Sequence, residues 1–216
     1  MALWSGFVDL LQLCIFGLTH LYGGHLGPAI LTFALLARLT LLPLTLRLAL
    51  RSRAQARAMK RLRPALDALR ERWKEDPARL GQETLALYER KQVSPLDPVL
   101  LKGSLVQAPL FLGLFKAIRG VLSGAVGRQP FLWIGNLASP DLFLAMGAAG
   151  VVGLGVAVGA PEHAAGGRAL LLVAFLGTFF MLTRLSAGFG LYVGASGIVS
   201  LLQGLMVRRI DVTDDS

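Results

Sequence analysis

Five long apolar runs are separated by polar segments along this chain of 216 residues. A bilayer core of ~30 Å requires about 20 apolar residues in a helix, at ~1.5 Å of rise per residue. Runs of suitable length predict membrane-spanning helices at 23–46, 99–118, 141–159, 169–187 and 190–207. The pattern therefore predicts an all-α polytopic membrane protein with five transmembrane helices.

A shorter apolar segment, 1–22, precedes the first run and carries one polar stripe. Ser5, Asp9 and Gln12 are spaced i, i+4 and i+7, so they share one face of a helix. We expect this segment to be an amphipathic helix that lies in the membrane interface, with Trp4 as an aromatic anchor. The alternative is a sixth transmembrane helix, because the run has only marginal length for a span.

A polar segment, 47–98, separates the first span from the second. Apolar residues three and four positions apart predict the seam of a charged helix there: Met59, Leu62, Leu66, Leu69 and Trp73. Asp76 before Pro77 supplies an N-cap and a first-turn proline for a second helix, which ends near Gln92. We expect an antiparallel helical hairpin outside the membrane. Pro64 is expected to kink the first arm or to mark its start.

The distribution of charge predicts the orientation in the membrane. Between Arg47 and Lys91, thirteen Lys and Arg residues face six Asp and Glu residues. The positive-inside rule places this hairpin in the cytoplasm, together with the loop 160–168 and the tail 208–216. The N-terminal helix and the loop 119–140 are then external. A tight turn over 186–190 is expected to join the last two spans.

One charge, Arg38, lies inside the first apolar run. Counted from either end of 26–46, it is roughly 12 to 18 Å from the interface. An arginine at that depth costs about 2.5–3.5 kcal/mol on insertion scales. We therefore expect Arg38 to face water or a partner inside the protein, and to mark a functional site.

Composition excludes several classes of function. Hydrophobic residues make up 54% of the chain and charged residues 16%, which excludes an ordinary soluble domain. The single cysteine, Cys14, excludes a disulfide framework, and the three histidines lack metal-ligand spacing. The sequence has no glycine-rich phosphate loop and no nucleophile elbow. We expect no enzymatic activity, no cofactor and no metal.

A series of short sequence motifs, each occurring once, extends in order along nearly the whole chain. They are Arg38 with Pro43-Leu44-Thr45, the hairpin arms 59–72 and 82–88 with Pro95-Leu96, 106–111, Phe131-Leu132-Trp133-Ile134 with Asn136-Leu137, and 188–192. Together they resemble the YidC membrane protein insertase family of the Oxa/Alb/YidC superfamily, in a compact form without the large external domain. The chain departs from the family at 97–103 and at Arg184, where an aromatic residue is common.

The resemblance implies an insertase of the bacterial inner membrane. Such a protein moves hydrophobic segments of nascent proteins into the bilayer through a hydrophilic groove that opens to the cytoplasm, without nucleotide hydrolysis. Arg38, Gln107 and Tyr192 would contact the substrate, with Lys102 at the mouth of the groove.

The resemblance also implies a recruiting role for the basic hairpin. Its cations Lys60, Arg61, Arg63, Arg70 and Arg72 would attract nascent chains, the ribosome, the signal-recognition-particle receptor or the Sec translocon. The simpler interpretation is that these cations fix the topology and contact anionic lipid.

A small transporter or channel for an anionic solute is the alternative function. Arg38 would then bind the solute, but the internal repeat typical of such transporters is not evident in the sequence. Binding of a specific nucleic acid is ranked last, because Trp73 and Tyr88 are the only aromatic residues within the basic segment.

Overall fold

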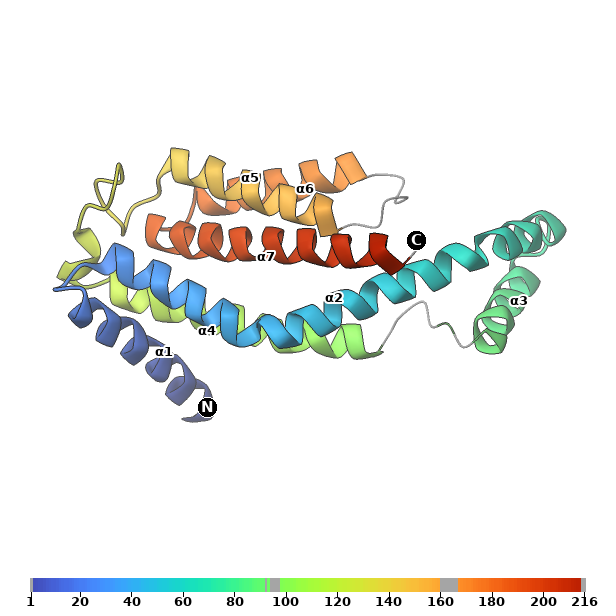
Figure 1. Ribbon diagram of the computed structural model, residues 1–216, viewed down its shortest axis with the longest axis horizontal. Helices are drawn as coiled ribbons and strands as arrows, with labels where there is room; N and C mark the ends of the chain where they lie inside the picture. Colours follow the sequence, from blue (N-terminus) through green and yellow to red (C-terminus); the bar gives the residue numbers. More distant parts are fainter. Residues whose placement is uncertain (1, 92, 94–97, 160–166, 215–216) are drawn as a thin grey trace. The chain divides into compact units, whose positions relative to one another are not determined.

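Helices make up the regular structure of the protein in the computed structural model (Figure 1). It describes residues 2–91, 93, 98–159 and 167–214, without the side chains of 2, 98–108, 110, 125–126, 167–168 and 210–214. Within these residues there is no strand, and the all-α prediction is confirmed. The elements are α1 (Ala2–Leu21), α2 (Leu26–Arg72), α3 (Pro77–Arg90), α4 (Pro98–Leu122), η1 (Ala125–Arg128), α5 (Leu142–Gly159), α6 (Gly167–Leu182) and α7 (Ala187–Asp214).

The chain divides into two units. One unit comprises Met1–Leu46 and Gln107–Ser216, and the other comprises Arg47–Val106. Helices α2 and α4 each contribute residues to both. We call the first the membrane unit and the second the hairpin unit.

Small residues bring α5 and α7 of the membrane unit together. A Cβ atom added at Gly194 of α7 would lie 3.6 Å from the Ala148 Cβ of α5. One added at Gly197 would lie 3.2 Å from methyl carbons of both Val151 and Val152. Such close approach increases dispersion contacts in lipid, where the hydrophobic effect does not drive one helix against another.

A second group of buried side chains joins α1, α2, α4 and the start of α7. Ile15, Ile30, Leu114 and Ile118 are at most 1% exposed, and they belong to one apolar cluster with Phe189. The Phe189 ring meets Phe115 edge to face, with 5.2 Å between ring centroids. This cluster fixes the beginning of α7 against α4.

Four of the described helices are long and apolar enough to cross a membrane by length and composition. They are α1, α2, α5 and α7, and α6 contains a shorter apolar helix, Ala169–Leu182. Since α1 is among them, the sixth-span alternative stays open beside the predicted interfacial helix. The predicted count of five spans and the segment boundaries stay predictions.

The predicted turn between the last two spans is misplaced. The Ser186 carbonyl accepts hydrogen bonds from the amides of Phe189 at 3.0 Å and Gly190 at 3.1 Å, so these residues form the first turn of α7. The connection is instead 183–186. A Cβ at Gly188 would lie 2.9 Å from Leu122 Cδ1, so this glycine serves close packing.

Helices cover both predicted arms of the hairpin, the end of α2 and the whole of α3. Asp76 Oδ1 accepts a hydrogen bond from the Arg79 amide at 3.0 Å and caps α3, which has a proline in its first turn. Leu62 and Leu66 on the predicted seam are buried. Helix α2 continues through Pro64, so a helix that starts at this proline is wrong. The motif residues Pro95-Leu96 lie outside the described residues.

We predict that Gly197→Leu destabilises the protein by about 1–3 kcal/mol, because the new side chain would overlap Val151 and Val152. Thermal unfolding of the purified protein in detergent measures the change. Gly147→Leu on α5 is the matched control, since a Cβ there meets no atom within 4 Å. Equal effects of the two substitutions would contradict the proposed role of close packing.

Candidate functional site

A row of polar side chains follows one face of α7. Tyr192, Ser196, Ser200 and Gln203 are separated by four, four and three residues, the spacing of one helical face. Arg38 and Thr45, seven residues apart on α2, meet this row through hydrogen bonds. We call these six residues the polar seam. All six belong to the membrane unit.

Arg38 is the charged member of the polar seam. Its Nε donates a hydrogen bond to the Ser196 carbonyl at 3.4 Å, and its Nη2 donates to the Ser200 hydroxyl. Ser200 Oγ donates in turn to the same Ser196 carbonyl at 3.0 Å. The guanidinium of α2 is therefore tied to one turn of α7.

The contacts of Arg38 leave its charge without a counter-charge. Its acceptors are a backbone carbonyl and a hydroxyl, and among the described residues no carboxylate forms an ion pair with it. The guanidinium has five N–H donors, so donors remain for a ligand. The Ser196 hydroxyl is buried beside the Tyr192 side chain on the same face of α7. Arg38 thus offers donor groups beyond those that the fold itself uses.

Thr45 and Gln203 extend the polar seam along the same two helices. The Thr45 hydroxyl lies 3.2 Å from Gln203 Oε1 and 3.2 Å from the Leu42 carbonyl, so it donates to one of them at a time. The Thr45 hydroxyl can therefore donate to the Leu42 carbonyl while Gln203 Oε1 accepts a hydrogen bond from another group.

Tyr192 lies within electrostatic range of Arg38, one turn before Ser196 on α7. Its ring is 5.9 Å from that of Phe189, measured between centroids, so the apolar part of Tyr192 continues the buried cluster. The structure thus brings together Arg38 and Tyr192, two of the three predicted groove residues.

The other predicted groove residues are not tested. Gln107 and Lys102 lie in α4, but their side chains fall outside the described part of the structure. Sequence reasoning also missed Ser196, Ser200 and Gln203 as partners. Their spacing with Tyr192 is the signal that could identify them, but serines are also common in membrane helices as packing residues, so the spacing alone does not indicate a site.

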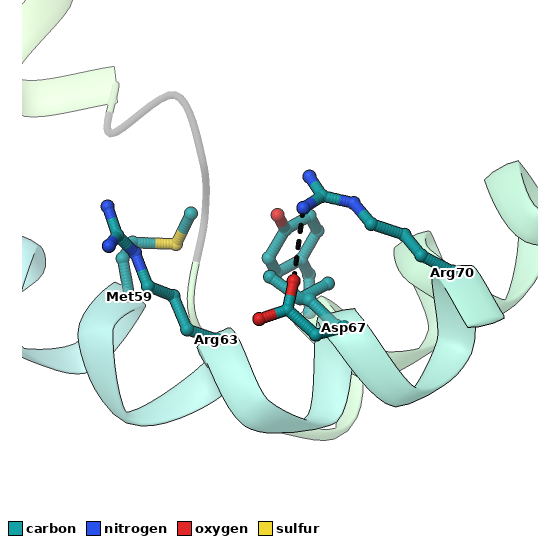
Figure 2. Close-up of a pocket in the computed structure, with 6 residues that line it drawn as sticks. Met59, Arg63, Asp67 and Arg70 are labelled. Atoms are coloured by element: carbon teal, nitrogen blue, oxygen red, sulfur yellow. Dashed lines mark hydrogen bonds and ion pairs between the residues drawn. The ribbon is translucent and has the colours of Figure 1, made fainter. Parts of the chain in front are cut away.

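The hairpin unit contains a cavity of about 400 Å³ (Figure 2). Figure 2 shows Arg63 and Arg70 on either side of Asp67, with Asp67 bonded to Arg70. That ion pair measures 3.2 Å, and both side chains are about two-thirds exposed (69% and 66%). Pairs this exposed contribute little stability. Met59, Leu66 and Tyr88 supply the rest of the lining, so the cavity combines apolar surface with a net positive charge.

The remaining predicted recruiting residues, Lys60, Arg61 and Arg72, also lie on the hairpin. The guanidinium groups of Arg72 and Arg79 lie 5.6 and 5.1 Å from the Trp73 ring centroid, so both form cation–π contacts. Lys60 and Arg61 are exposed. Within the described residues no group of His, Cys, Asp and Glu side chains is arranged to hold a metal.

Comparisons with known proteins identify the family of this chain. The family model described as 60Kd inner membrane protein matches residues 17–214. The chain is 30% identical over 188 residues to the membrane protein insertase YidC of Anaeromyxobacter sp. strain Fw109-5, covering 85% of this chain and 33% of the relative. It is 27% identical over 197 residues to YidC of Caldanaerobacter subterraneus, covering 88% of each chain.

A solved structure shares the fold. The crystal structure of an active YidC insertase, with its first transmembrane domain resolved, aligns with a TM-score of 0.61 at 23% identity, over 92% of this chain and 45% of the other. The chain spans about a third of the Anaeromyxobacter relative and most of the Caldanaerobacter one. Since the family model matches nearly all of the sequence, the chain belongs to the 60Kd inner membrane protein family, the YidC family that its motifs predicted.

Proposed function

We propose that the protein is a membrane protein insertase, which moves hydrophobic segments of nascent proteins into the bilayer. The observation that carries this proposal is the charge of Arg38 on the polar seam, which lies inside the otherwise apolar run 26–46 of α2 and has no carboxylate partner among the described residues. The names of the relatives support it, since those proteins are called membrane protein insertases.

In this proposal the polar seam lines a hydrated groove that opens to the cytoplasm. Water in the groove lowers the cost of keeping Arg38 charged at membrane depth. The guanidinium attracts acidic and polar groups of an entering segment and carries them part of the way across. Transfer of the apolar part of that segment into lipid supplies the driving force, at ~0.8 kcal/mol per CH₂ group, so no nucleotide is consumed. Gln107 would add a further hydrogen-bonding side chain, with Lys102 at the mouth.

The proposed topology follows from charge. The N-terminus and the loop 119–140 lie outside, whereas the basic hairpin and the C-terminus lie in the cytoplasm. The groove then faces the compartment in which nascent chains are made.

We predict that Arg38→Ala and Arg38→Glu lower insertion of a single-span client with an acidic tail by tenfold or more. This is the effect expected from losing about 1.5–3 kcal/mol of charged hydrogen bonding. Arg38→Lys should retain much of the activity, because the positive charge persists. Insertion into proteoliposomes that contain the purified variant measures it.

Arg184→Ala is the control for this series, since Arg184 is an exposed arginine outside the polar seam. Each variant is first compared with the parent protein by thermal unfolding, so that loss of fold is recognised. Normal insertion by well-folded Ala and Glu variants would show that the Arg38 charge does not act on the client.

Access to the polar seam separates an insertase groove from a transporter. We predict that Ser200→Cys, in a Cys14→Ser background, reacts with a membrane-impermeant thiol reagent from the cytoplasmic face only. The background removes Cys14, which is exposed. Labelling of Cys at 200 from both faces would instead indicate alternating access and favour transport of an anionic solute.

For the hairpin we propose a recruiting role centred on its cavity. Arg63 and Arg70 present two guanidinium groups beside the apolar surface of Met59 and Leu66. This combination suits an acidic side chain that is followed by an apolar one, so the partner would be an acidic protein segment. A bound carboxylate would replace Asp67 on Arg70 at small cost, because that pair is exposed.

We predict that the double substitution Arg63→Glu with Arg70→Glu lowers ribosome-coupled insertion several-fold. Insertion of a purified client added after synthesis should stay unchanged, because the polar seam is intact. Arg90→Glu with Lys91→Glu is the matched control, with the same charge change outside the cavity lining. Equal activity of both double variants in the coupled assay would leave the hairpin with a role in topology and lipid contact alone.

A further inference from the structure

The loop before α5 contains a two-residue turn that presents apolar side chains outward. The Phe131 amide donates to the Ile134 carbonyl at 2.8 Å, and the Ile134 amide donates back to the Phe131 carbonyl at 2.9 Å. Leu132 and Trp133 at the tip are 71% and 60% exposed. Ile134 and Leu137, just after them, are 2% and 0% exposed, so the base of the turn belongs to the buried cluster.

The backbone at the tip is strained. Leu132 has a backbone φ of 54°, in the left-handed region that residues other than Gly, Asn and Asp rarely adopt. Residues held in such conformations persist only where the surrounding structure fixes them, and they gather at sites with a function. Here the two hydrogen bonds of the turn hold Leu132 in a conformation that directs it away from the protein.

The turn is tied to the beginnings of two membrane-spanning helices. Asp141 Oδ1 accepts the Leu144 amide at 2.7 Å, which caps α5, and it lies 3.4 Å from the Trp133 indole nitrogen. The amide of Ala187, the first residue of α7, donates to the Ser139 carbonyl at 2.8 Å. The tip therefore has a fixed position relative to the ends of α5 and α7.

Apolar exposure continues from the tip onto the first turn of α5. Leu142 and Phe143 are 60% and 72% exposed, and both belong to the candidate span of α5. The surface of a span faces lipid, and Leu132 and Trp133 lie just beyond its end. Tryptophan at that level places its ring in the headgroup region while its N–H keeps a polar partner.

We propose that Leu132 and Trp133 form a membrane anchor that inserts into the headgroup region of the bilayer beside the start of α5. The ligand of this surface is the lipid interface itself. Insertion buries two side chains that would otherwise be held in water by a strained backbone. The proposal does not depend on the client or on the direction in which the protein is oriented.

Tryptophan fluorescence tests the anchor, because the chain has three tryptophans, Trp4, Trp73 and Trp133. The variant Trp4→Phe with Trp73→Phe leaves Trp133 as the only emitter. In vesicles whose lipid chains are brominated near the carbonyl end, we expect strong loss of its emission. Bromines near the methyl end should quench it less, and aqueous acrylamide should quench it weakly.

The variant Trp4→Phe with Trp133→Phe, which keeps Trp73 on the hairpin, is the matched control. Its emission should be several-fold less sensitive to brominated lipid than that of Trp133 and should be quenched by acrylamide. If Trp133 behaves as Trp73 does, the turn lies in water and the proposal is wrong. A surface for a protein partner would then be the better interpretation of its exposed side chains.

A second measurement keeps all three tryptophans. A nitroxide attached to Leu132→Cys, in the Cys14→Ser background, reports relaxation by oxygen, which concentrates in lipid, and by a water-soluble nickel complex. We expect greater relaxation by oxygen than at a nitroxide on Gly81→Cys of the hairpin, where an added Cβ meets no atom within 4 Å. Equal ratios at the two positions would overturn the anchor even if the tryptophan variants did not fold.

Discussion

The need to satisfy one charge in an apolar environment shapes the membrane unit. A guanidinium at bilayer depth is stable only beside polar groups or water. Helix α7 provides these groups through the Ser196 carbonyl and the Ser200 hydroxyl, so α2 and α7 must meet along the polar seam. None of these acceptors carries a full negative charge, and the positive charge therefore remains available. An aspartate at the same place would have neutralised Arg38 and made it a purely structural residue.

Close helix packing is the second condition for this arrangement. Hydrogen bonds between α2 and α7 need the two helices to lie close together, and a glycine at the start of α7 leaves room for the side chains of its neighbours. A side chain at Gly188 would collide with Leu122, and also approach Ile30 of α2 at 3.2 Å. The other side of α7 meets α5 through Gly194 and Gly197. Helix α7 is therefore positioned from two sides by residues that contribute almost no volume.

The sequence predicted what depends on composition and short-range pattern. The all-α fold, the Asp76 cap and the buried seam at Leu62 and Leu66 follow from local spacing and from the hydrophobic effect. The turn between α6 and α7 was misplaced because a glycine that permits a turn and a glycine that permits close packing look the same in a sequence. The partners of Arg38 are 158 and 162 residues away along the chain, so only the tertiary structure identifies them.

The anchor and the polar seam are linked by the length of α7. Ser196 and Ser200 lie nine and thirteen residues after Ala187, whose amide is hydrogen-bonded to the Ser139 carbonyl in the loop before α5. At ~1.5 Å per residue this places them about 14 and 20 Å from the helix start. In a bilayer core of ~30 Å, Ser196 and Ser200 would then lie near the middle. Counting residues along α2 independently places Arg38 at a similar depth. If Leu132 and Trp133 hold the start of α7 at the membrane interface, the fold itself determines how deep the Arg38 guanidinium lies in the bilayer. That depth then does not depend on the client.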